Sequence, residues 1–243
     1  MDVLVWSRFQ LPWGSAGSDM TARLVEPEWL DELPVEDPGA IGSRRDLRRL
    51  NWFMNHAAIM SAALRAFPKP SRVVDLGAGD GAFTLKLAIS AQWKNVEVVL
   101  VDRSATISPD VRRAFQALDC SVSCIQQDVF DALEIVGSAD GILANLFLHH
   151  FKDIALQRLF SIAALRCRWL VACEPRRSAM ALTASRLVGL IGCNAVTRHD
   201  AVASVRAGFR ADEISEQWPA NGEWSLKERP AGLFSHLFVA SRS

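Results

Sequence analysis

The stretch that decides the fold is Val73–Phe83, VVDLGAGDGAF. A β-branched run leads through Asp75 into a turn that contains Gly77, Gly79 and Gly81, and a helix-like segment follows. Glycines are needed where the backbone turns sharply and a ligand approaches main-chain atoms. The N-terminus of the following helix offers free N–H groups and the positive end of a helix dipole. The stretch therefore predicts a cofactor site at the end of a first β-strand.

The glycine turn by itself leaves two cofactor classes open. Gly77, Gly79 and Ala82 satisfy the G-x-G-x-x-A pattern of dinucleotide-binding folds, so a nicotinamide cofactor is one alternative. Asp75 favours another class, because a carboxylate two residues before the first glycine would repel a pyrophosphate. It suits a cofactor with a cationic end.

Outward from this stretch, short strand-like runs alternate with helix-like segments. The runs are 73–76, 96–102, 121–126, 141–145 and 168–174, and the helices are Phe83–Ser90, Pro109–Leu118 and Ile154–Leu165. This alternation predicts a parallel sheet covered on both faces. Two closing strands, Glu213–Trp218 and Leu233–Ala240, leave no room for a crossover helix. We therefore expect an α/β, Rossmann-like, seven-stranded, mostly parallel sheet with an antiparallel last strand.

The N-terminal part is expected to form a helical cap, with residues 1–69 as extension and cap and residues 70–243 as the main domain. Residues 1–42 read as loop with a short helix near Glu28–Glu32, and Met20 is an alternative start that would make residues 1–19 an extension. Ser43 is expected to begin a long helix, and the side of that helix with His56 is expected to lie over the cofactor.

Further carboxylates follow the next two strands. Asp102 ends the second strand, where an acidic residue accepts hydrogen bonds from ribose hydroxyls in nucleoside-cofactor folds. Arg103 beside it is either a stacking partner for adenine or a surface charge. Asp128 follows the third strand and either contacts the cofactor or caps the next helix. All these residues fall at carboxyl ends of strands, where open α/β sheets bind ligands.

With these residues in place, DLGAGDG at 75–81 resembles the first motif of class I S-adenosylmethionine-dependent methyltransferases. The resemblance implies S-adenosyl-L-methionine as cofactor, with S-adenosyl-L-homocysteine as product. It also implies that Asp128 accepts a hydrogen bond from the adenine amino group and that the main chain of Val129 contacts the ring. Asn145, at the end of the fourth strand, is expected to touch the amino-acid end of the cofactor. The cofactor-binding set is Asp75, Gly77, Ala78, Gly79, Asp102, Arg103, Asp128, Val129 and Asn145.

The segment LHHFKD, residues 148–153, resembles the LHDWSD-type segment of plant and microbial small-molecule O-methyltransferases. In that family the first His is the general base, which implies this role for His149, and a neutral His is a natural base for a hydroxyl. His150 stands where the family has Asp and is the alternative base. Glu174 ends the fifth strand, where the resemblance implies a residue that orients the catalytic His. A helix-capping role for Glu174 is the alternative.

The amino-acid composition limits the kinds of partner that we expect. Lys and Arg together number 27, as do Asp and Glu, so the formal net charge is zero. Tight nucleic-acid binding usually needs a basic excess, so we expect neither a nucleic-acid nor a membrane partner. The five Cys lack metal-ligand spacing, and we therefore expect no metal and a reducing, cytoplasmic location. A homodimer is one option for the oligomeric state.

The expected function is O-methylation of a small molecule with a phenolic or polyketide-derived hydroxyl. The EPRRS and GLFSHLFVA segments, with the chain from Val25 onward, are similar to methyltransferases found beside bacterial type III polyketide synthases. Alternatives are C- or carboxyl-methylation with the same cofactor, an NAD(P)-dependent oxidoreductase, and a non-catalytic sensor of S-adenosylmethionine. Arg176 and Arg177 are expected to be solvated or to bind an anionic substrate group.

Overall fold

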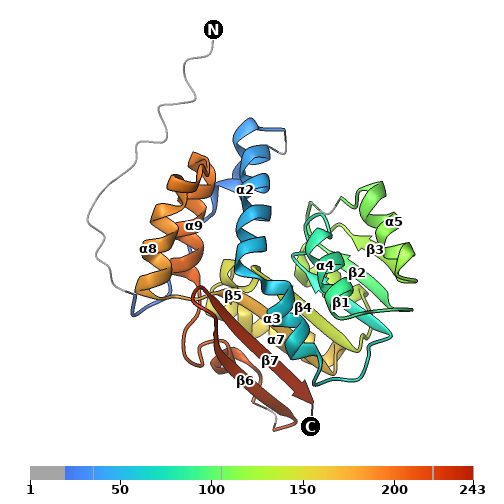
Figure 1. Ribbon diagram of the computed structural model, residues 1–243. Helices are drawn as coiled ribbons and strands as arrows, with labels where there is room; N and C mark the ends of the chain where they lie inside the picture. The colour runs from blue at the N-terminus through green and yellow to red at the C-terminus, as the bar shows by residue number, and fades with distance from the viewer. Residues whose placement is uncertain (1–19, 35, 105, 221, 243) are drawn as a thin grey trace.

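The computed structural model describes residues 20–34, 36–104, 106–220 and 222–242, and its centre is a seven-stranded sheet (Figure 1). The strand order is β3-β2-β1-β4-β5-β7-β6. Strands β1 to β5 are parallel, and β7 runs antiparallel to both of its neighbours. The predicted fold class is therefore confirmed. The strands are β1 (Arg72–Leu76), β2 (Glu97–Val101), β3 (Ser121–Ile125), β4 (Gly141–Asn145), β5 (Trp169–Pro175), β6 (Trp224–Ala231) and β7 (Ser235–Arg242).

Helices cover both faces of the sheet, so the central strands are buried on both sides. One face packs on α6 (Val129–Ile135) and α7 (Asp153–Arg166), through residues such as Val74 and Phe160. The other face packs on three further helices, through residues such as Leu143 and Leu87. These are α3 (His56–Leu64), α4 (Ala82–Ser90) and α5 (Pro109–Ala117). Near-continuous apolar strands such as GILAN are what a sheet buried on both faces requires.

A helical cap stands beyond the carboxyl ends of the strands. Figure 1 shows α2 (Pro38–Met54), α8 (Ala179–Leu187) and α9 (Ala195–Ala207) side by side. Residues 20–34, which we call the strap, include the short helix α1 (Trp29–Glu32) and pack against α9. No described helix has the length and apolarity needed to cross a membrane.

Several predicted boundaries are wrong, each for a local reason. Residues 213–218 are not a strand, because the Glu228 carboxylate accepts the N–H groups of Ile214 and Ser215 and stabilises a turn that includes the 3-10 helix Ser215–Gln217. The cap helix begins at Pro38, with Asp37 as its N-cap, rather than at Ser43. It ends before Asn55, which adopts a left-handed conformation.

Helix α6 was not among the predicted segments, although the capping alternative for Asp128 implies a helix there. The sequence predicts a helix over Asp200–Ala207 with Asp200 as its N-cap, whereas α9 begins at Ala195 with Asn194 as its N-cap. Residues 1–19, the expected extension, lie outside the described residues.

Candidate active site

The carboxyl ends of β1 to β5 meet along one edge of the sheet and bring most of the predicted residues together. Leu76 pairs in register with Ala144, and Asn145 pairs with Cys173, so the glycine turn, Asn145 and Glu174 lie beside one another. Leu76 also pairs with Val101, which places Asp102 on the other side of the glycine turn. Parallel register therefore accounts for the convergence of residues spread over a hundred positions.

The glycine turn is held close to β2. The N–H groups of Gly77 and Ala78 both donate to the carbonyl of Val101, and Gly77, Gly79 and Gly81 all have positive φ. A Cβ on Gly77 would lie 2.2 Å from the Phe147 ring, whereas a Cβ on Gly79 would meet nothing within 4 Å. The backbone at Gly79 therefore faces open space, which a ligand that contacts main-chain atoms needs.

Asp75 is buried directly below this turn. Its carboxylate accepts a hydrogen bond from the Thr84 hydroxyl, on the first turn of α4. Burial raises the pKa of Asp75 to about 7, the charge of Asp102 adds to the rise, and the Thr84 hydrogen bond opposes it. A carboxyl group that changes its charge near neutrality is well suited to respond to a cationic ligand.

Asp102 and Asp128 use part of their carboxylates to stabilise loops. The Asp102 carboxylate accepts the Gly79 N–H at 2.9 Å and the Ser104 N–H at 2.8 Å. Asp128 is the N-cap of α6 and accepts the Phe130 N–H, as the capping alternative predicts. Each carboxylate oxygen has two lone pairs, so both groups keep acceptor capacity. Arg103 is exposed, and Val129 is buried at the start of α6.

The Asn145 side chain is linked to α3 through His56. Its side-chain oxygen lies 2.7 Å from His56 Nδ1, and His56 Nε2 lies 2.7 Å from the Ser235 hydroxyl. Burial lowers the pKa of His56, so the ring is neutral near pH 7. His56 thus reaches the predicted cofactor edge, but as a buried connector between α3, β4 and β7.

His149 is held by Glu174 at the start of the loop that follows β4. Glu174 is fully buried, and its Oε1 accepts the N–H groups of Phe147 and Leu148. Its Oε2 lies 2.8 Å from His149 Nδ1. One carboxylate therefore caps the 3-10 helix Leu148–His150 and also orients the imidazole, which leaves Nε2 facing the strap.

Glu28 of the strap, which we did not single out from the sequence, lies on the other side of this imidazole. Its Oε1 is 3.4 Å from His149 Nε2, too poorly aligned for a hydrogen bond but close enough for an ion pair. Burial lowers the pKa of His149, but Glu174 and Glu28 outweigh it and raise that pKa to about 9. Burial raises the pKa of Glu28, but His149 outweighs it and lowers that pKa to about 2. His149 is therefore an imidazolium between two carboxylates.

His150 completes the cluster. Its Nδ1 lies 3.6 Å from an Asp31 carboxylate oxygen, and burial together with the neighbouring His149 lowers the pKa of His150. Within the described residues, Glu28, His149 and His150 form a group whose possible metal-ligand atoms lie within 4.8 Å of one another. A protonated imidazole has no lone pair for a metal ion, so metal binding here would require His149 to lose its Nε2 proton.

The strap is fastened to α9 at Glu28 and directly after it. The Asp200 carboxylate accepts the N–H groups of Trp29 and Leu30 at 2.9 and 3.0 Å. It therefore caps α1, whereas the sequence predicts that it caps its own helix. The Trp29 ring stacks on His199 with a centroid distance of 3.9 Å. The Ser204 hydroxyl donates to the Glu28 carboxylate. Glu28 is thus placed at His149 by contacts with α9.

Arg177 is buried, so the expectation that it is a solvated charge is wrong. Its guanidinium pairs with Glu213 and donates to carbonyls of Met20, Thr21 and Gly208. Because these partners use all of its N–H donors, Arg177 fastens the beginning of the strap rather than binding substrate.

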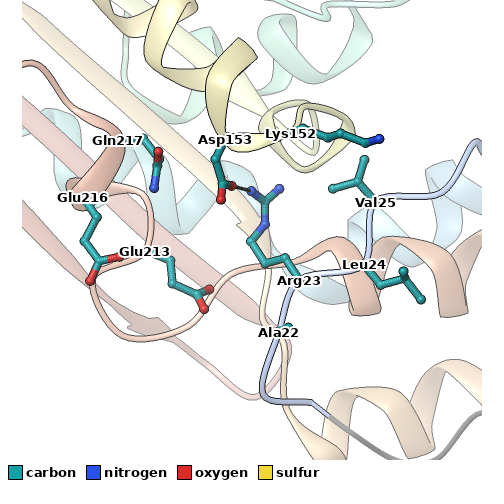
Figure 2. Close-up of a pocket in the computed structure, with 9 residues that line it drawn as sticks. All are labelled: Ala22, Arg23, Leu24, Val25, Lys152, Asp153, Glu213, Glu216 and Gln217. Atoms are coloured by element: carbon teal, nitrogen blue, oxygen red, sulfur yellow. Dashed lines mark hydrogen bonds and ion pairs between the residues drawn. The ribbon is translucent and has the colours of Figure 1, made fainter.

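A groove of about 570 Å³ lies between the strap and the start of α7 (Figure 2). Arg23 points across it to Asp153 at 2.9 Å and also donates to the carbonyls of Phe151 and Ala207. None of the predicted site residues lines this groove. Since Arg23 is already paired, the groove is a feature of strap packing and is separate from the edge that carries His149.

Residues 73–168, which contain the glycine turn and the His149 loop, match a family model described as a methyltransferase domain. The expected enzyme class is thereby confirmed, and the match covers Asp75, Asp102, Asp128 and both histidines but ends before Glu174. No curated protein sequence matches the chain.

Solved structures of methyltransferases share the fold. The plantazolicin methyltransferase BpumL in complex with SAH has a TM-score of 0.62 at 11% identity, over 86% of this chain and 92% of BpumL. The pyocyanin biosynthetic protein PhzM has a TM-score of 0.60 at 19% identity, over 86% of this chain and 60% of PhzM. The mitomycin 7-O-methyltransferase MmcR has a TM-score of 0.54 at 16% identity, over 88% of this chain and 60% of MmcR. The chain thus spans about three fifths of the length of PhzM and MmcR, and at these identities the likeness is one of fold.

Proposed function

We propose that the chain transfers a methyl group from S-adenosylmethionine to a hydroxyl of a small molecule, with His149 as the general base. The single observation that carries this proposal is the Glu174–His149 pair at the edge of the glycine turn, with Nδ1 held at 2.8 Å and Nε2 facing the strap. The name of MmcR, a mitomycin 7-O-methyltransferase, supports transfer to an oxygen of a small molecule, and the name of PhzM, a pyocyanin biosynthetic protein, supports a small-molecule substrate.

The cofactor half of the site fits S-adenosylmethionine. The open backbone at Gly79 provides space, Asp102 offers acceptors for ribose hydroxyls, and Asp75 offers a carboxyl group for a cationic end. When bound, this cofactor supplies a methyl group on a sulfonium, which needs no further activation. Asp128 and the Val129 main chain would contact the adenine, and Asn145 the amino-acid end.

The acceptor half of the site has two tasks, to orient a hydroxyl and to remove its proton. Glu174 orients His149 through Nδ1, so the proton of the acceptor passes to Nε2. Removing the proton makes the oxygen the stronger nucleophile for the methyl group. A phenolic or polyketide-derived hydroxyl suits this base, because phenols with an ordinary pKa near 10 are within reach of an imidazole.

The test is His149→Ala assayed with labelled S-adenosylmethionine and a panel of phenols. Loss of a general base lowers kcat by about 10² to 10⁴, while binding of S-adenosylhomocysteine, measured by calorimetry, should be unchanged. Lys94→Ala is the control, because Lys94 is exposed on the loop before β2, at the amino ends of the strands and away from the cluster. Turnover that survives His149→Ala would remove His149 from the mechanism.

A second candidate is methylation of a carboxylate. It is favoured by the imidazolium of His149, which already faces the carboxylate of Glu28. The two candidates differ in their pH dependence. Activity with a hydroxyl acceptor rises as His149 loses its proton, whereas a carboxylate acceptor held by the imidazolium loses activity over the same range. The mass and alkali sensitivity of the product separate an ether from an ester.

A further inference from the structure

The sequence offers no hint that Glu28 belongs to the site, yet the strap is built to place it there. Glu28 is largely buried, and its carboxylate accepts from the Ser204 hydroxyl while it faces Nε2 of His149. The flanking contacts of Asp200 with the Trp29 and Leu30 N–H groups fix the backbone immediately after Glu28. A carboxylate held in this way has a defined position.

Nε2 is also the atom that an acceptor hydroxyl must reach. Nδ1 is occupied by Glu174, so one nitrogen remains for proton transfer. Glu28 Oε1 lies 3.4 Å from that nitrogen and is therefore in the space that the acceptor oxygen would use. The carboxylate and an acceptor hydroxyl cannot both sit against Nε2.

We propose that Glu28 is a positioning residue that competes with the acceptor for Nε2 of His149 and keeps the base protonated until the acceptor displaces it. The proposal rests on methyl transfer through His149. Displacement moves a carboxylate away from the imidazolium, so the ring gives up its proton to solvent and Nε2 becomes an acceptor for the hydroxyl proton. Nothing is oxidised or reduced in this exchange.

The charged groups around the cluster agree with this arrangement. Glu174 of β5 and Glu28 of the strap stabilise the imidazolium, while the neighbouring His150 faces Asp31, and Arg103 lies close enough to Asp31 to lower its pKa. Burial dominates at Asp31 and raises its pKa overall. Of the two carboxylates on His149, Glu174 is fixed by three backbone N–H groups, and Glu28 is the one carried by a separate segment.

The experiment compares Glu28→Gln, Glu28→Asp and the matched control Glu32→Gln, an exposed glutamate at the end of α1, the short helix that follows Glu28. The pKa of His149 is measured by NMR in the S-adenosylhomocysteine complex, which needs no turnover, and kcat/KM is measured against pH. In Glu28→Gln the pKa of His149 should fall and the rise of kcat/KM should move to lower pH. At a pH below the pKa of His149 in both proteins, lowering that pKa by one raises kcat/KM about tenfold.

The kinetic constants add a readout that a purely structural role would not change. If Glu28 competes with the acceptor, KM for the acceptor falls in Glu28→Gln, and Glu28→Asp restores the wild-type pH profile at least in part. Ser204→Ala, which removes the hydroxyl that holds Glu28, should shift the pKa of His149 in the same direction by less. This second variant guards against a folding defect in Glu28→Gln.

Three results would overturn the proposal. The first is an unchanged pKa of His149 in Glu28→Gln, and the second is a raised KM with an unchanged profile, which would make Glu28 an acceptor-binding group. The third is a divalent cation that the wild type retains and Glu28→Gln loses, which would make the cluster a metal site. If the pKa shifts but His149→Ala still turns over, the general-base mechanism fails while the ion pair between Glu28 and His149 stands.

Discussion

The cofactor half and the acceptor half of the site are built in different ways. Asp75, the glycine turn and Asp102 lie within 28 positions and are held by strands paired in register. The acceptor half joins Glu28 from the strap to His149 and to Ser204 of α9, residues up to 176 positions apart. We infer that the first half is rigid because the sheet holds it, whereas the second depends on one segment staying docked.

This contrast predicts that changes in the glycine turn have the largest effect on the free energy of unfolding. Gly77→Ala places a Cβ 2.2 Å from the Phe147 ring at a φ of +71°, whereas Gly79→Ala meets nothing within 4 Å at a φ of +55°. Left-handed backbone costs a non-glycine residue about 1–2 kcal/mol, and overpacking adds about 1–3 kcal/mol. Gly77→Ala should therefore lower the free energy of unfolding clearly more than Gly79→Ala.

Urea unfolding of the two variants, with binding of S-adenosylhomocysteine as second measurement, checks this expectation. Gly79→Ala is the matched control for backbone strain, because it shares the positive φ and lacks the clash. Equal destabilisation of the two variants would mean that Phe147 moves aside easily and that the turn is not held rigidly against the His149 loop.

The same contrast explains how much could be read from the sequence. The parallel strands and the acids at their ends were predictable, because β-branched runs and a glycine turn are local signals whose positions the sheet then brings together. Glu28 was not predictable, because its role comes from the docking of the strap and no local pattern marks it. Residues 213–218 alternate like a strand, yet the carboxylate of Glu228, from a later strand, makes them a turn.

Asp75 offers a test of the cofactor half with a smaller effect. Its pKa of about 7 means that the buried carboxyl group is largely neutral below that pH. If the cationic end of the cofactor binds the ionised form, affinity for S-adenosylhomocysteine rises about tenfold per pH unit up to about pH 7 and then levels off. Calorimetry across this range measures the slope, and Asp75→Asn should remove it.

The pH dependence that Asp75 gives to the stability of the fold has the opposite sign to the one that it gives to cofactor affinity. An acid whose pKa is raised by folding holds its proton more tightly in the folded state, so the free energy of unfolding falls as pH rises from the ordinary value of 3.8 towards about 7. Affinity and stability should therefore change in opposite directions over this range. If the affinity of the wild type for S-adenosylhomocysteine does not vary with pH, Asp75 takes no part in cofactor binding.

The smallest effect is expected where the strap meets α9. Asp200→Asn removes one of the two carboxylate oxygens that accept the Trp29 and Leu30 N–H groups. Loss of a hydrogen bond to a charged group costs about 1.5–3 kcal/mol when the partner is left unpaired, and less here because Trp29 and Leu30 are only partly buried. The strap should open more often while the sheet stays intact.

Amide hydrogen exchange resolves these two regions in one measurement. Asp200→Asn should speed exchange in residues 24–32 and leave β1, β2 and β4 unchanged, because the strands are paired independently of the strap. Asp153→Asn is the matched control, since its ion pair with Arg23 is largely exposed on the carboxylate side, and such pairs contribute about 0–1 kcal/mol. If exchange in the strap and in the strands rose together, the two halves would unfold as one unit, and Glu28 could not leave His149 without disturbing the cofactor edge.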